Sequence, residues 1–312
     1  MIRNKAHTIW HNNDSLSSLK SIELDPQQDN CVSSRYSMVS LGTERLVASG
    51  MIADEWHDVM KVPYMKGRLS LPCSYGYSLV GINSLNQPVH LLHPHQDLCA
   101  VDSSNLFEIP EASPRYTLLS NMETAINIYW DASPAKSDQV LILGAGVIGL
   151  LTASVFRKAG HQVFLFDTDP VRKQWVHEKG FNTTTPSDQS YPLIINTSGK
   201  STALNMAIDL CTKEGTIVEA SWYGKGNVPV NLGGKFHYNR LTIKSSQVGT
   251  IPAHTKDQWT FFKRKQLCLE YLKDDFYDIF VDKVIGFEEL PGEFETIRSG
   301  KYKYLSLIIK YY

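Results

Sequence analysis

Three glycines at a fixed spacing, Gly144, Gly146 and Gly149, constrain this chain more than any other feature. They follow an apolar run, "QVLIL", that is typical of a buried β-strand, and they precede helical periodicity over residues 147–159. A loop that turns directly from a strand into a helix needs glycine where the backbone bends tightly and where the helix packs closely on the strand. The pattern therefore predicts the first strand–loop–helix unit of an open parallel sheet.

Strands and helices continue to alternate after this unit. The strands are "QVFLF", "PLIINT", "TIVEAS" and "LTIKSS", and the helices between them are predicted over 170–179 and 201–213. Such alternation indicates an α/β fold in which helices cover both faces of a doubly wound parallel sheet.

The regions on either side of this alternation have a different character. Residues up to about 112 contain short β-like runs separated by Gly, Pro and Asn, and a helical stretch follows and ends near Ser133. A long amphipathic helix over 256–272 leads into a mixed tail that we expect to rejoin the first region. The sequence therefore predicts a β-rich domain formed by residues 1–115 and 254–312, and a parallel-sheet domain formed by residues 116–253.

Composition limits the kinds of partner. The 312 residues carry a net charge of −1, which favours neither nucleic acid nor a membrane surface as a partner and leaves a small molecule. The uncharged run 140–156 contains three glycines and is shorter than the roughly 20 apolar residues of a membrane span. Five scattered cysteines and a start without a secretory signal predict free thiols and a cytoplasmic location.

The glycine loop predicts a dinucleotide site. The first glycine permits the turn, the second lets a pyrophosphate approach the backbone, and the third lets the helix pack on the strand. The helix begins at Val147 and Ile148, whose backbone N–H groups would face the phosphates together with the positive end of the helix dipole. The alternative is an ordinary strand–turn–helix unit with a capping aspartate and no ligand.

The end of the next strand predicts which dinucleotide is bound. Asp167 stands where an acid would accept hydrogen bonds from both ribose hydroxyls and would repel a 2′-phosphate, which favours NAD(H) over NADP(H). Arg172 is the counter-argument, because a nearby base can bind a phosphate. Further cofactor contacts are expected from Thr197, Ser198 and Ser221, which end the following strands.

A β-rich region followed by this strand, glycine loop and Asp167 resembles the medium-chain dehydrogenase/reductase superfamily, the alcohol dehydrogenase-like proteins, over nearly the whole chain. The phrases "SLGTERLVASG", "YGYSLVG" and "HPHQD" resemble most a branch that includes bacteriochlorophyllide a dehydrogenase. The resemblance implies a GroES-like catalytic domain joined to a Rossmann domain, and a homodimer.

The zinc site of that superfamily is not matched. Leu41 and Tyr77 stand where the resemblance places a cysteine and a histidine ligand, and the four-cysteine structural lobe is missing. Leucine has no donor atom and a phenol is a poor zinc ligand, so we expect a zinc-less member. A second metal candidate is the cluster of His90, His93, His95 and Asp97, although Pro94 interrupts its spacing and the family resemblance implies that the segment is a surface turn.

Without zinc, hydrogen-bond donors or a general acid must stabilise the developing alkoxide. The resemblance implies that Thr43 bonds the substrate oxygen and that Tyr77 lines the same pocket. It also places Glu123 near the carboxylate metal ligand of the polyol-dehydrogenase branch, and it implies that Glu44 or Glu123 orients Tyr77 or relays a proton. Leu46 stands in place of the relay histidine. The structural alternatives are that Thr43 caps a turn, Tyr77 fills the space of the metal and Glu44 pairs with a base such as Arg45.

These observations predict a zinc-independent, NAD(H)-dependent oxidoreductase that acts on an alcohol/carbonyl pair. One alternative is an NADPH-dependent quinone or enone reductase. Another is a dinucleotide-binding protein without turnover that acts as a sensor or docking module.

Overall fold

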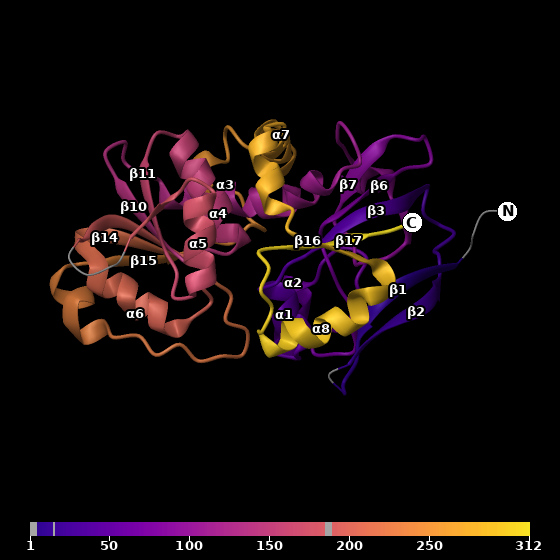
Figure 1. Ribbon diagram of the computed structural model, residues 1–312, viewed down its shortest axis with the longest axis horizontal. Helices are drawn as coiled ribbons and strands as arrows, with labels where there is room; N and C mark the ends of the chain where they lie inside the picture. Colours follow the sequence, from indigo (N-terminus) through magenta and orange to yellow (C-terminus); the bar gives the residue numbers. More distant parts are fainter. Residues whose placement is uncertain (1–4, 15, 185–188) are drawn as a thin grey trace. The chain divides into compact units, whose positions relative to one another are not determined.

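A computed structural model of the chain describes residues 5–14, 16–184 and 189–312. The chain divides into two compact units, the first formed by Met1–Ser120 with Tyr271–Tyr312 and the second by Asn121–Glu270 (Figure 1). The divisions predicted from the sequence lie at residues 115 and 254.

The second unit contains a six-stranded sheet in the order β12-β11-β10-β13-β14-β15, and every pair in it is parallel. Its strands are β10 (Gln139–Leu143), β11 (Gln162–Phe166), β12 (Asn182–Thr183), β13 (Tyr191–Asn196), β14 (Cys211–Glu219) and β15 (Thr242–Ser245). The direction in which successive strands are added reverses between β10 and β13. Open α/β sheets bind their ligands at such a reversal, outside the carboxyl ends of the strands. The predicted parallel sheet is confirmed.

Helices cover this sheet, and most of their bounds agree with the prediction. Helix α4 (Val147–Lys158) packs against β10 and β11, and α6 (Ser201–Leu210) packs against β13 and β14 (Figure 1). Helix α5 (Pro170–Glu178) follows β11. Helix α6 ends three residues before the predicted 213 because Cys211 already pairs with Tyr191 in the sheet.

Two further helices differ at their starts from the prediction. Helix α3 (Leu119–Ala132) is preceded by a 3-10 turn over Pro114–Leu118. Helix α7 (Phe261–Leu272) begins five residues later than predicted. The Thr260 hydroxyl accepts the N–H of Lys263 at 3.2 Å and so caps the helix at its start, a local signal stronger than the apolar periodicity before it.

The first unit consists mainly of two sheets. One has the order β16-β17-β3-β6-β7-β9 with β8 also paired to β3, and the other has the order β2-β1-β5-β4. The strands are β1 (Lys5–His11), β2 (Ser17–Glu23), β3 (Asn30–Val39), β4 (Lys66–Gly67), β5 (Cys73–Ser74), β6 (Leu79–Ile82), β7 (Pro88–Leu91), β8 (Leu98–Val101), β9 (Phe107–Glu108), β16 (Lys283–Gly286) and β17 (Leu307–Lys310). Strand β17 pairs antiparallel with β3, so the end of the chain belongs to this sheet.

The first unit also contains the α-helices α1 (Thr43–Ala48), α2 (His57–Met60) and α8 (Leu290–Ser299), and α8 packs against α1 (Figure 1). Ala48 of α1 lies in one buried cluster with Phe294 and Ile297 of α8 and with Leu307 of β17. Burying one large apolar side chain contributes about 1.5–3 kcal/mol, so this cluster anchors α1 and the polar residues at its start. Within the described residues, no helix is long and apolar enough to cross a membrane.

Candidate functional site

The glycine loop has the tight geometry that the spacing predicted. Gly144 follows β10 with φ +102°, and a Cβ there would lie 2.8 Å from the Cα of Ser198. A Cβ on Gly149 would lie 1.9 Å from the carbonyl oxygen of Gly144, a distance that no side chain can occupy. Both positions therefore require glycine, one because of its backbone conformation and the other because helix and loop touch.

The start of α4 is open to an anion. The helix begins after Gly146, and no side chain in the described residues caps it there. A Cβ on Gly146 would meet only the Arg172 guanidinium, at 3.7 Å. The backbone N–H groups of Val147 and Ile148 lie in the first turn of this twelve-residue helix, beside a cationic side chain. Unpaired N–H groups and positive charge at a helix start can bind a phosphate.

Asp167 lies beside this loop. Its Oδ2 accepts the N–H of Ala145 at 2.8 Å, and its Oδ1 accepts the N–H of Asp169 at 2.9 Å. The Arg172 Nη1 lies 3.7 Å from Oδ2, and the Asp167 side chain is only 10% exposed. A carboxylate and a guanidinium are therefore neighbours beside the glycine loop.

The polar residues predicted at the next strand ends are brought to the same edge of the sheet. Thr197 Oγ1 donates to the carbonyl oxygens of Leu143 and Gly144, at 3.1 Å each, and so ties β13 to the glycine loop. The Ser221 hydroxyl accepts the N–H of Gly199 at 3.0 Å. Ser198 donates to the side chain of Asn196 rather than pointing freely outward.

One network at this edge was not predicted. Glu219 Oε2 accepts hydrogen bonds from Asn196 Nδ2 at 2.7 Å and from the Tyr223 hydroxyl at 3.0 Å, and its Oε1 accepts the N–H of Ser221. Burial, followed by the Glu219 charge, raises the pKa of Tyr223 well above its ordinary value. Asn196 and Glu219 are the last residues of two adjacent parallel strands, and this shared position in the sequence pattern could have predicted that their side chains meet.

In the first unit, Tyr77 belongs to a hydroxyl cluster formed by Ser40, Thr43 and Tyr77. The Ser40 and Thr43 side chains interact with the phenol and favour its charged form. Burial raises the pKa of Tyr77 to about 12; the Ser40 hydroxyl opposes the shift, the Glu44 charge adds to it, and the Thr43 hydroxyl opposes it. The phenol is therefore protonated at neutral pH and can act as a donor.

Glu44 is fully buried at the start of α1 and has two partners. Its Oε1 accepts the N–H of Ser40 at 2.8 Å, and its Oε2 lies 2.8 Å from Nε2 of His95. His95 is also fully buried, and its Nδ1 lies 2.7 Å from the Ser37 hydroxyl. The base that pairs with Glu44 is thus a histidine far away in the sequence and not the neighbouring Arg45.

The interpretation of the histidine cluster as a surface turn is wrong. His90, His93 and His95 are 0%, 3% and 0% exposed. The backbone of His95 is hydrogen-bonded on both sides: its carbonyl accepts the N–H of Ile9, and its N–H donates to the carbonyl of Tyr75. The segment therefore runs inside the unit.

These histidines do not converge on one point. His90 Nε2 bonds the Ser78 hydroxyl, His93 Nδ1 donates to the Pro94 carbonyl, and His95 faces Glu44. Within the part of the chain that the structure describes, no group of three or more His, Cys, Asp or Glu side chains could hold a metal ion.

Glu123 on α3 is held by a buried arginine. Arg264 of α7 is 3% exposed; its Nε lies 3.2 Å from Glu123 Oε1, and its Nη1 donates to Asn127 Oδ1 and to the Val248 carbonyl. Burial raises the pKa of Glu123, while Lys265 and Arg264 oppose the shift. Arg264 precedes the buried Cys268 by four residues and so lies on the same apolar face of α7. This spacing could have predicted that Arg264 is buried.

Comparisons with known proteins agree with this architecture. The ketopantoate reductase family PanE/ApbA matches residues 140–220, which contain the glycine loop. D-guloside 3-dehydrogenase from Shigella flexneri is 23% identical over 215 residues, which cover 62% of this chain and 61% of that protein. L-galactonate-5-dehydrogenase from Escherichia coli K12 is 28% identical over 133 residues, which cover 38% of each chain. The matched parts therefore span less than two thirds of these relatives.

Solved structures resemble nearly the whole chain. An alcohol dehydrogenase (rspB) from Escherichia coli CFT073, complexed with NADH, has a TM-score of 0.76 at 15% identity and covers 99% of this chain and 100% of its own. A putative zinc-binding dehydrogenase from Sinorhizobium meliloti 1021, bound to NADP, has a TM-score of 0.77 at 15% identity, with the same coverage. The chain has the fold of the medium-chain dehydrogenases and reductases: a Rossmann domain with a β-rich, GroES-like domain.

Proposed function

We propose that this chain is an oxidoreductase that transfers a hydride between NAD(H) and an alcohol/carbonyl substrate, without zinc. The observation that carries the proposal is the hydrogen bond between Asp167 and Ala145, which holds a carboxylate against a loop that only glycine can form. The similar proteins support it, because by name they are dehydrogenases and two of the similar structures contain NADH or NADP.

The residues present fit a nicotinamide dinucleotide. The glycine loop and the first amides of α4 would hold the pyrophosphate, Asp167 the adenosine ribose, and the strand ends at Thr197, Ser198 and Ser221 the remaining polar groups. Bound there, the nicotinamide supplies or accepts the hydride.

The polar residues of the first unit would manage the substrate oxygen and its proton. The Thr43 and Tyr77 hydroxyls would donate hydrogen bonds to that oxygen as negative charge develops on it during carbonyl reduction. Because the pKa of Tyr77 is raised to about 12, the phenol keeps its proton at neutral pH until a stronger base, such as an alkoxide, is present. In alcohol oxidation, each hydroxyl would accept the substrate proton while it donates its own, and Glu44, next to Thr43 in the chain, would be the base that takes the proton from them.

Zinc independence is part of the proposal. Leu41 offers no donor atom, Tyr77 interacts with the Ser40 and Thr43 side chains, and Glu123 is bonded to Arg264. An arginine side chain against Glu123 supplies the positive charge that a metal would otherwise supply there.

NAD(H) is the preferred cofactor because Asp167 would lose acceptor bonds and repel charge if a 2′-phosphate were present. The groups that would favour NADP(H) are Arg172 and Lys200. The Lys200 Nζ donates to the Thr168 hydroxyl at 3.3 Å. The similar proteins do not favour the quinone reductase and sensor alternatives, because by name they are dehydrogenases.

The purified protein tests the proposal in a single screen. Nicotinamide absorbance is followed with NADH and NADPH against aldehydes, ketones, enones and quinones, and with NAD against secondary alcohols, including the sugar derivatives that the names of the relatives suggest. We expect turnover of an alcohol/carbonyl pair, with less than stoichiometric zinc and no loss of rate in chelator. Turnover that follows the zinc content would overturn the mechanism, and binding without turnover would support a sensor.

A further inference from the structure

Four buried side chains of the first unit form a continuous hydrogen-bonded chain, here called the buried relay: Glu44, His95, Ser37 and Tyr311. Glu44 Oε2 lies 2.8 Å from His95 Nε2, His95 Nδ1 lies 2.7 Å from Ser37 Oγ, and Ser37 Oγ lies 2.8 Å from the Tyr311 hydroxyl. The first three are 0% exposed and Tyr311 is 4% exposed. Such a line of polar groups is costly to bury unless each group is bonded, as each one is here.

The inner end of the buried relay lies at the hydroxyl cluster. Glu44 directly follows Thr43, and it accepts the N–H of Ser40, whose side chain interacts with Tyr77. The Glu44 charge also contributes to the raised pKa of Tyr77, so the two groups interact electrostatically.

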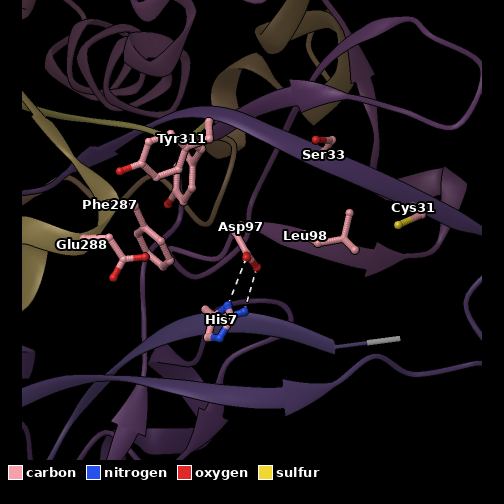
Figure 2. A pocket seen from close by; sticks show the side chains of 9 residues that line it. His7, Cys31, Ser33, Asp97, Leu98, Phe287, Glu288 and Tyr311 are labelled. Atoms are coloured by element: carbon pink, nitrogen blue, oxygen red, sulfur yellow. Dashed lines mark hydrogen bonds and ion pairs between the residues drawn. The ribbon is translucent and has the colours of Figure 1, made fainter. Parts of the chain in front are cut away.

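The outer end lies at the wall of a cavity of about 470 Å³ in the same unit (Figure 2). Tyr311 lines this cavity together with Phe287, Glu288 and the pair His7–Asp97, in which Nδ1 lies 3.3 Å from Oδ2. The His7 side chain is 43% exposed, so the cavity beside Tyr311 is in contact with solvent.

The chemistry of the members distinguishes a relay from a structural brace. A brace for Glu44 needs only His95, whereas here the histidine is continued by two hydroxyl groups toward the cavity. An imidazole can accept a proton at one nitrogen while it releases one from the other, and each hydroxyl can accept one proton while it donates another. Every link of the buried relay therefore can pass a proton without a lasting charge on Ser37 or Tyr311.

We propose that the buried relay carries the proton of the reaction between the hydroxyl cluster and the cavity beside Tyr311. In alcohol oxidation, His95 starts as the tautomer that carries its hydrogen on Nδ1, and a proton that reaches Glu44 Oε2 passes to the unprotonated Nε2. The Nδ1 proton then passes to Ser37 Oγ, the Ser37 proton passes to Tyr311, and the Tyr311 proton leaves to water. One proton enters, one leaves, and carbonyl reduction runs the same steps in reverse. The proposal rests on the proposed oxidoreductase function, and it assigns positioning and proton-transfer roles to His95, Ser37 and Tyr311.

Other titratable groups near His95 do not compete for this proton at neutral pH. Besides Glu44, the groups that interact with His95 are His11 and His93. Burial lowers the pKa of His11 to about 3 and that of His93 to about 4, so both are neutral. Around Tyr311, the interacting groups are Cys99, Asp97 and Glu44. Burial keeps the Cys99 thiol protonated by raising its pKa.

The decisive variant is Tyr311→Phe, with Tyr304→Phe as the matched control. Tyr304 is a buried tyrosine of the same unit whose hydroxyl donates to Glu293 and lies outside the buried relay. With a substrate that the wild type turns over, we expect Tyr311→Phe to lower kcat on the order of tenfold, with KM and NADH affinity unchanged. We also expect a larger solvent deuterium isotope effect, and recovery of rate in imidazole buffer. Tyr304→Phe should show none of these effects.

Ser37→Ala is the second variant and should behave in the same way if Tyr311→Phe proves unstable. A Tyr311→Phe or Ser37→Ala protein with normal NADH affinity, wild-type kcat and no buffer dependence would overturn the relay but leave the proposed function intact. A wild type that binds NADH but turns over no substrate would overturn both.

Discussion

The Asp167 carboxylate accepts a hydrogen bond from the backbone N–H of Ala145, 22 positions earlier in the chain, at 2.8 Å. This contact joins the end of β11 to the glycine loop at the end of β10, so the acid that would bind a ribose and the amides that would bind a pyrophosphate form one rigid edge. Binding a dinucleotide there requires little reorganisation, which lowers the entropic cost of association.

Gly149→Ala tests the glycine loop. The new Cβ would lie 1.9 Å from the Gly144 carbonyl oxygen, so the loop must move away from α4. We expect a loss of about 1–3 kcal/mol in the free energy of unfolding and NADH affinity lowered on the order of 100-fold, measured by denaturation and calorimetry. Gly233→Ala is the control, because a Cβ there meets nothing within 4 Å. Wild-type NADH affinity in Gly149→Ala would contradict the account.

Thr43→Val and Tyr77→Phe test the hydroxyl cluster. Each variant removes a hydroxyl proposed to bind the substrate oxygen, so we expect kcat/KM to fall on the order of 100-fold while the Kd of NADH stays unchanged. Thr117→Val is a matched control, because its buried hydroxyl donates only locally, to the Pro114 carbonyl. Steady-state kinetics with the best substrate of the wild type measure kcat/KM for each variant. Unchanged kcat/KM in both variants would remove the cluster from the mechanism.

Arg264→Met tests the buried pair with Glu123. The variant leaves a carboxylate buried without its cation, which typically costs about 3–5 kcal/mol in the free energy of unfolding. Adding Glu123→Gln should recover part of that loss, which urea denaturation of both proteins would reveal. The kcat of Glu123→Gln alone separates the roles of Glu123. A normal kcat would make this residue purely structural, whereas a loss of kcat at normal stability would make it catalytic.

Stability should fall as the solution becomes acidic. The folded-state pKa values of His93 and His11, about 4 and about 3, lie below the unfolded value of 6.5, so the unfolded chain binds their protons first. Each histidine therefore removes up to about 1.4 kcal/mol per pH unit as the pH falls from 6.5 toward 4. Denaturation at several pH values measures the slope. His93→Gln should flatten it and the exposed His237→Gln should not; equal slopes in all three proteins would contradict the burial argument.

The Rossmann half of the fold could be predicted from the sequence because its signals are local. Apolar strands such as "QVLIL", the glycine spacing and the periodicity of α4 and α5 all lie within a few residues of each other, and the predicted bounds agree closely. The start of α7 was missed because a single side chain, that of Thr260, decides it.

The partners of the candidate catalytic residues could not be predicted, for a physical reason. Glu44 meets His95 and Glu123 meets Arg264 only because distant strands and helices pack together, at sequence separations of 51 and 141 residues. No local pattern specifies such contacts. The family resemblance implied a surface turn around Pro94, yet backbone hydrogen bonds of His95 with Ile9 and Tyr75 place that segment inside the unit.

The most direct measurement of the central claim is a calorimetric titration of the folded protein with NADH, repeated on Asp167→Ala and with NADPH. We predict one NADH site per chain, NADH affinity about tenfold or more lower in Asp167→Ala, and a smaller or reversed effect of the same change on NADPH. Folded wild-type protein that binds neither NADH nor NADPH would contradict the account.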